Sequence, residues 1–174
     1  MNNFAVEILD DIGALCTFYT VRWLDSELSE THKFFEKYDA IEDYSESAKK
    51  LSTFVFCVIG EDYGATDILF NRHENEVIGL PTKGRVHLGE IHHYYPNFPL
   101  RLYALRINEN IVVLFNGGIK DAATNQEASL RMQWREACLF AQKINEAIRD
   151  EMIIINVFRR KLLWHNHSTE IILP

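Results

Sequence analysis

The sequence is poor in cysteine, has no long apolar run and carries no excess of basic residues. Its three cysteines, Cys16, Cys57 and Cys138, lie far apart in apolar surroundings and form no CxxC pair. This pattern argues against a disulfide framework and predicts buried, reduced thiols. No stretch approaches the roughly 20 apolar residues of a membrane-spanning helix, and the first residues lack the pattern of a secretory signal. We therefore expect a soluble, cytoplasmic protein with no membrane partner.

What the sequence does contain is many apolar and aromatic residues and an uneven acidic charge. Of 174 residues, 47% are hydrophobic and 12% aromatic, which predicts one packed domain over residues 1–174. The net charge of −7 arises mainly in residues 1–60, which carry 5 Lys/Arg against 11 Asp/Glu. The segment 72–120 instead holds six Lys/Arg, four Asp/Glu and four of the seven histidines. An anionic partner is expected to bind this segment.

Residue patterning predicts an α+β domain. Runs rich in branched and aromatic residues predict strands, and apolar residues three or four positions apart predict helices. In chain order, the expected elements are strands 4–9 and 15–24, helices 27–38 and 44–59, strand 77–80, strands 100–107 and 111–115, helix 127–152, and strands 153–158 and 170–173. The last two strands are expected to pair with each other.

Glycine, proline and polar residues mark the expected boundaries of these elements. Gly60 is expected to end the second helix, although the apolar, β-prone residues 53–59 leave a strand as the alternative for its last part. Residues 116–118 (NGG) are expected to break the second central strand. Residues 82–99, which contain two Gly and two Pro, are expected to form a long irregular loop. Residues 121–126 are expected to form a polar linker before the long helix.

The clearest local pattern is a central hairpin. Residues 100–107 (LRLYALRI) are followed by 111–115 (IVVLF) and then by 117–120 (GGIK). This arginine–aromatic strand, followed by a strand that ends in Gly and Lys, resembles the central hairpin of RelE/ParE-type toxins. The HigB-like branch and its larger relatives in Bacteroidetes are the most similar. The order of the expected elements resembles that family over residues 4–173.

The resemblance implies an antiparallel sheet with two N-terminal helices packed on it, a long later helix and C-terminal strands. It also implies the toxin of a type II toxin–antitoxin system: an endoribonuclease that cuts mRNA on the ribosome, needs no metal or cofactor, and arrests growth. The implied partners are a cognate antitoxin, for which a helix-turn-helix protein is one form, and the ribosome with its mRNA. Arg101, Tyr103 and Lys120 occupy the matching motif positions.

Candidate site residues follow from the chemistry of metal-free RNA cleavage. This reaction needs a base for the 2′-hydroxyl, a cation for the phosphate and an acid for the leaving oxygen. Arg101 is expected to clamp the phosphate with its planar fork, and Lys120 to add a point charge. Tyr103 and Arg106 are expected to help bind the substrate. A loop cluster offers proton transfer and base stacking: His92, His93, Tyr94 and Tyr95.

Each candidate residue also has a structural interpretation, and two further histidines raise the question of a metal site. Arg101 suits a strand arginine paired with acidic helices, and Tyr103 suits a buried strand tyrosine. Lys120 suits a solvated strand end. His165-x-His167 would place two imidazoles on one side of an extended segment. Because no third ligand lies at a diagnostic spacing, no metal site is expected.

The residues after Lys120 and the overall charge leave a second function open. Many RelE/ParE ribonucleases are strongly basic and have a basic or aromatic cluster after the lysine, whereas residues 121–126 (DAATNQ) are neither. These departures favour a catalytically inactive RelE-fold protein that acts as a protein–protein interaction or regulatory module. A third hypothesis is a regulator that binds a partner through an acidic helical face over residues 25–46.

Overall fold

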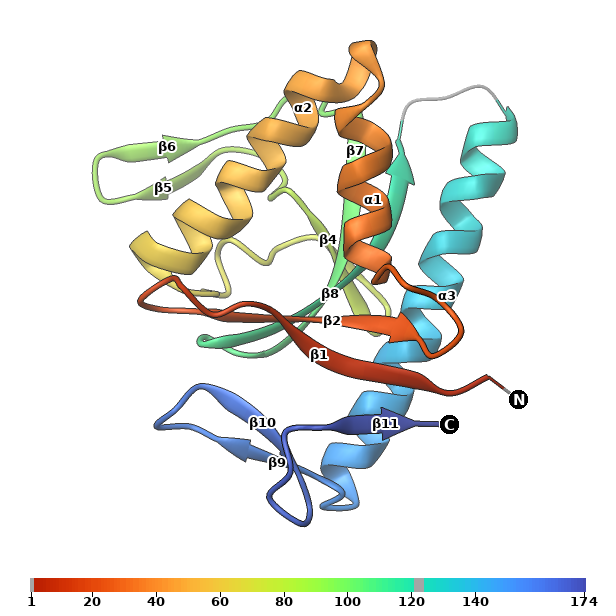
Figure 1. Ribbon diagram of the computed structural model, residues 1–174. Helices are drawn as coiled ribbons and strands as arrows, with labels where there is room; N and C mark the ends of the chain where they lie inside the picture. Colours follow the sequence, from red (N-terminus) through yellow and green to blue (C-terminus); the bar gives the residue numbers. More distant parts are fainter. Residues whose placement is uncertain (1, 121–123) are drawn as a thin grey trace.

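A mixed β-sheet forms the centre of the chain (Figure 1). The computed structural model describes residues 2–120 and 124–174. Within these residues, seven strands run in the order β11-β1-β2-β8-β7-β4-β3. Their bounds are β1 Phe4–Asp10, β2 Thr17–Trp23, β3 His73–Glu74, β4 Val77–Leu80, β7 Leu100–Asn108, β8 Ile111–Ile119 and β11 Ile171–Leu173. The α+β class is confirmed, but the expected antiparallel sheet is wrong at one place, because β2 and β8 pair in parallel.

Helices cover both faces of the sheet. α1 (Glu30–Asp39) and α2 (Glu42–Thr53) lie on one face, and α3 (Thr124–Arg149) packs across the other (Figure 1). α2 continues into a π-helical segment, η1 (Phe54–Tyr63). The helical start of residues 124–126 shortens the linker expected over 121–126, whose first three residues lie outside the described part of the chain.

Alternate residues of β7 enter two separate cores, because successive side chains of a strand point to opposite faces. Leu100, Leu102 and Ala104 pack beneath α1, α2 and η1. Tyr103 and Leu105 pack beneath α3. The direction of each β7 side chain, and so the face on which a site can form, follows from this alternation.

The two N-terminal helices differ from the expectation at their ends. α1 begins at Glu30 and not at 27, because the Ser29 side chain accepts a hydrogen bond from the His32 N–H and caps the helix. The second helical stretch does not end at Gly60. It continues through η1 to Gly64, whose φ of +76° suits glycine and ends the helix.

Gly60 instead forms backbone hydrogen bonds with the turn between β1 and β2. Its carbonyl oxygen accepts hydrogen bonds from the N–H groups of Leu15 at 2.9 Å and Cys16 at 3.1 Å. A Cβ on Gly13 would lie 2.5 Å from the same oxygen, so this turn and η1 are in direct backbone contact. The three cysteines are free, but Cys57 on η1 is exposed and not buried as expected.

The segment 82–99 contains a short hairpin where an irregular loop was expected. β5 (Val86–Leu88) pairs with β6 (Ile91–His93) as a separate two-stranded sheet. Gly89, with a φ of +64°, supplies the turn. β8 likewise continues through Gly117 and is not broken there. A Cβ at this position would overlap the carbonyl of Arg101, so glycine allows β8 to approach β7 this closely.

The C-terminal strands do not pair with each other. β9 (Ile153–Asn156) pairs with β10 (Lys161–Trp164), and β11 adds to the outer edge of β1, with Phe4 opposite Leu173. The Tyr19 hydroxyl joins the β9–β10 hairpin to the sheet: it accepts a hydrogen bond from the Leu162 N–H at 2.8 Å.

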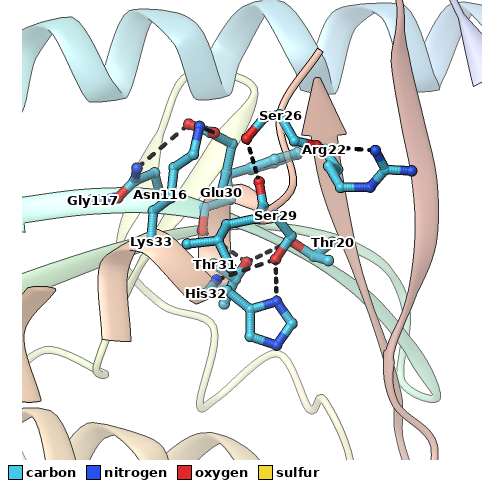
Figure 2. A network of polar contacts seen from close by, with 12 residues as sticks. Thr20, Arg22, Ser26, Ser29, Glu30, Thr31, His32, Lys33, Asn116 and Gly117 are labelled. Carbon is cyan, nitrogen blue, oxygen red and sulfur yellow. Dashed lines mark hydrogen bonds and ion pairs between the residues drawn. The ribbon is translucent and has the colours of Figure 1, made fainter. Parts of the chain in front are cut away.

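Buried polar contacts fasten the start of α1 to β2 and β8 (Figure 2). The Thr31 hydroxyl lies 2.7 Å from that of Thr20 and donates to the carbonyl of Phe115 at 2.9 Å. The Asn116 amide donates to Glu30 at 3.4 Å. Glu30 is only 4% exposed, so a carboxyl group is held in the interior at this helix start.

Candidate functional site

A cavity of about 400 Å³ lies between β7 and the first half of α3. Its lining comes from β3, β7, α3 and the residue that follows β8: Glu74, Arg101, Tyr103, Lys120, Leu130, Arg131 and Trp134. Three of these side chains are cationic and one is a carboxylate. The volume suits a ligand the size of a nucleotide, because small-molecule sites span about 300–1,000 Å³.

Arg101 and Tyr103 form the inner wall of this cavity. Both lie on the α3 face of β7, and they are 4% and 2% exposed. The neighbouring strand leaves room for them, because it has glycine opposite Tyr103. A Cβ on Gly79 would lie 2.7 Å from Arg101 Cδ and 2.6 Å from Glu74 Oε2. Gly79 therefore allows the guanidinium side chain and the carboxylate to lie over the same point of the sheet.

The charges around Tyr103 keep its phenol protonated. Burial raises the pKa of Tyr103, the Glu74 carboxylate raises it further, and Arg101 and Arg72 lower it by a smaller amount. The result is a pKa far above neutrality. Tyr103 is therefore a hydrogen-bond donor in this cavity, and it does not carry a charge.

α3 contributes the outer wall. The Trp134 indole N–H donates to the Glu74 carbonyl at 3.0 Å, which ties the helix to β3. Leu130 lies one turn earlier and approaches Gly118 of β8. Arg131 is exposed, as is Lys120, so these two cations lie toward solvent while Arg101 lies inside.

Four lining residues were not among the candidates from the sequence: Glu74, Leu130, Arg131 and Trp134. Leu130 and Trp134 lie four positions apart in the helix expected over 127–152, and apolar residues at this spacing indicate a face that packs against the sheet. The sequence carried no signal for which strand these two residues would contact. Glu74 could not be foreseen, because β3 has only two residues and reaches the cavity through long-range pairing with β4.

The loop cluster lies elsewhere in the structure. The described lining of the cavity includes none of its four residues. His93 is buried, with its ring 5.7 Å from that of Tyr63, and Tyr95 packs against Phe54 at 5.2 Å. Tyr94 is covered by the guanidinium of Arg85 at 4.1 Å. The fourth member, His92, is exposed on β6.

Arg106 faces away from the cavity. By the alternation of β7 it belongs to the opposite face from Arg101 and Tyr103. Its guanidinium donates to the Ala65 carbonyl and lies 3.1 Å from the Asp67 carboxylate. These contacts hold the segment after η1 against the sheet.

Among the described residues, no three or more His, Cys, Asp or Glu side chains gather as a metal site would require. His165 and His167 do not lie in an extended segment: His167 has a φ of +67° and donates its N–H to the Trp164 carbonyl in a turn. The described helices include none with the length and apolar character needed to cross a bilayer.

The cavity therefore combines a buried guanidinium, two solvent-facing cations, a neutral phenol, an indole and one carboxylate. Such a set suits an oxyanion attached to a flat ring, because arginine binds phosphate through its fork and indole stacks on bases. Comparisons of the chain with protein-family models, with curated protein sequences and with solved structures find no match.

Proposed function

We propose that the chain is a toxin of the RelE/ParE type that binds RNA in this cavity and cuts it without a metal, on ribosome-bound mRNA. The observation that carries the proposal is the shared location of Arg101, Tyr103 and Lys120. These three positions carry the family resemblance, and all three line one cavity. A cognate antitoxin is the partner that would restrain the activity.

Binding would follow the charge layout of the cavity. The exposed Lys120 and Arg131 attract the RNA backbone, and Arg101 receives one phosphate through two parallel N–H groups. Trp134 offers an apolar ring surface on which the adjacent base stacks. Glu74, the carboxylate among the described lining residues, faces the same space and is available for proton transfer.

The proposed cleavage step balances with residues of the cavity. Glu74 takes the proton of the ribose 2′-hydroxyl, whose oxygen attacks the adjacent phosphorus. The bond to the 5′-oxygen breaks, and Tyr103 supplies the proton to this leaving oxygen. The products are a 2′,3′-cyclic phosphate and a 5′-hydroxyl. Arg101 neutralises the charge that develops on the phosphate oxygens. Glu74 takes this role in place of His92 and His93.

A second candidate function is a protein–protein interaction module. It is favoured by the burial of Arg101, which is 4% exposed beneath α3, and by the net charge of −7, which opposes general RNA affinity. In this case Arg101 stabilises the fold, and the exposed cations contact an acidic partner.

Growth after induced expression tests the proposal. The native chain is compared with Arg101→Lys, which keeps the charge but loses the planar fork, and with Glu74→Gln. Arg159→Ala is the matched control, because Arg159 is an exposed arginine on a hairpin remote in sequence from the cavity. We expect arrest by the native chain and the control, and none by the two site variants.

Mapping of mRNA ends during arrest then tests the chemistry, with 5′-hydroxyl ends expected. If the folded native chain causes no arrest, the toxin proposal is wrong and the interaction module is favoured. If Arg101→Lys arrests growth as strongly as the native chain, the cavity is not the site.

A further inference from the structure

Two histidines face each other on the outer side of the β5–β6 hairpin. His87 and His92 are direct cross-strand partners, and their ring centroids lie 4.0 Å apart with planes tilted by 58°. Both residues are exposed. On the other side of the hairpin, the partners Val86 and His93 are buried. The hairpin projects beside α2 (Figure 1), so it offers two imidazoles to solvent from an anchored base.

We propose that His87 and His92 together bind a divalent transition-metal ion of the Zn²⁺, Ni²⁺ or Cu²⁺ class. Imidazole nitrogen is a preferred ligand of all three ions. Both rings must place a nitrogen about 2.0–2.1 Å from a zinc ion. Rings already in contact across a strand pair reach this arrangement by side-chain rotation. Water completes the coordination shell, because the described residues bring no third His, Cys, Asp or Glu to the pair.

Ion binding would stabilise the hairpin. A two-stranded ladder with three residues in each strand is marginal in water. An ion held by one residue from each strand binds only the paired form, so binding free energy adds to the stability of that form. Ligation needs unprotonated imidazole, and acid therefore releases the ion.

The site is separate from the cavity around Arg101, whose described lining includes neither histidine. Whether or not this pair binds metal, the proposed RNA function is unaffected. Ion binding requires only the rotation of two exposed side chains, so replacement of either histidine should leave the fold intact.

His165 and His167 provide a matched control. They are also exposed and lie two positions apart. Their segment forms a turn, with the His167 N–H bound to the Trp164 carbonyl at 2.8 Å. Histidine spacing alone would favour this pair, whereas the structure favours His87 with His92.

Calorimetric titration of the full chain with Ni²⁺, and separately with Zn²⁺, tests the proposal at neutral pH. The native chain is compared with His87→Ala, His92→Ala and the double variant His165→Ala/His167→Ala. We expect saturable binding of a single ion, affinity at least about tenfold weaker in each single variant, and native affinity in the double variant. Circular dichroism without metal verifies that each variant is folded, and His92→Asn replaces any alanine variant that is not.

Amide hydrogen exchange adds a readout of the hairpin. Protection of the β5 and β6 amides should rise with the ion in the native chain and not in His87→Ala. Absence of saturable binding overturns the proposal. So does native-like affinity in either single variant, or loss of binding in the control double variant.

Discussion

Glu136 on α3 shares a hydrogen bond with Glu30 at the start of α1, so two carboxyl groups meet from helices on opposite faces of the sheet. Lys33 lies 2.8 Å from Glu30 and pairs with its charge. Burial, together with the hydrogen bond and negative charge of Glu30, raises the pKa of Glu136 to about 7, and the charge of Lys33 offsets part of this rise. The pair is stable when Glu136 keeps its proton.

This pair predicts that the chain loses stability as pH rises toward and through neutrality. The folded pKa of about 7 lies above the ordinary value of 4.5, so the folded state binds more protons between these values. The stabilisation is complete below the ordinary value and is lost as pH rises through the folded pKa. We expect Glu136→Gln to flatten the change in melting temperature between acidic and mildly alkaline buffer.

Glu146→Gln is the control for this prediction, because Glu146 is an exposed carboxylate on the same helix. Its pH profile of thermal unfolding should match that of the native chain. A Glu136→Gln profile that keeps the native slope would show that the two carboxyls do not share a proton.

Gly79→Ala should disturb the cavity more than the fold. The new Cβ would meet Glu74 Oε2 at 2.6 Å and Arg101 Cδ at 2.7 Å, both of which are side-chain atoms that can move. We expect a stability loss of only about 1 kcal/mol, with loss of growth arrest and weaker binding of an RNA oligonucleotide. Native-like binding would contradict the placement of the ligand beside Gly79.

Gly13→Ala should disturb the fold more than the cavity. Here the new Cβ would meet the Gly60 carbonyl oxygen at 2.5 Å and its carbon at 2.8 Å, and backbone atoms of a packed helix cannot turn aside. We expect a loss of about 3 kcal/mol in the free energy of unfolding, while oligonucleotide binding by the folded fraction stays native. Chemical denaturation monitored by tryptophan fluorescence measures the loss, and an unchanged midpoint would count against this contact.

Tyr19→Phe tests how the C-terminal hairpin is held. The variant removes the acceptor of the buried Leu162 N–H, which lies 2.8 Å from the hydroxyl. An unsatisfied buried donor costs about 1–3 kcal/mol, and the Leu162 amide should exchange faster with solvent. Tyr94→Phe, at an exposed tyrosine, should change neither quantity. Equal effects of the two variants would refute the role of the Tyr19 hydroxyl.

Local patterning predicted most of the elements but not how distant ones pair. The expected strand 77–80 is β4 as observed, and the N-terminal and central hairpins are confirmed within a few residues. Their signals are local, since turn residues and alternation lie within one short window. The parallel β2–β8 pair and the addition of β11 to β1 depend on which sheet edges are free, which no local window contains.

The residues of the candidate site also differ in whether local sequence could predict them. Arg101, Tyr103 and Lys120 belong to one hairpin, so their common location follows from nearby sequence. Glu74 and Trp134 reach the cavity only through the packing of α3 against β3. The short β5–β6 hairpin was missed because each strand has three residues, too few to show a period.

The central parallel pair has a consequence for synthesis of the chain. β2 can pair on its second edge only after β8 has been synthesised, because Thr17 pairs opposite Ile111. The ribosome must therefore release more than the first half of the chain before the N-terminal hairpin can join its sheet. Pairing over such sequence separation slows folding, and until then β2 presents an open edge, so nascent chains are most prone to mispair during this interval.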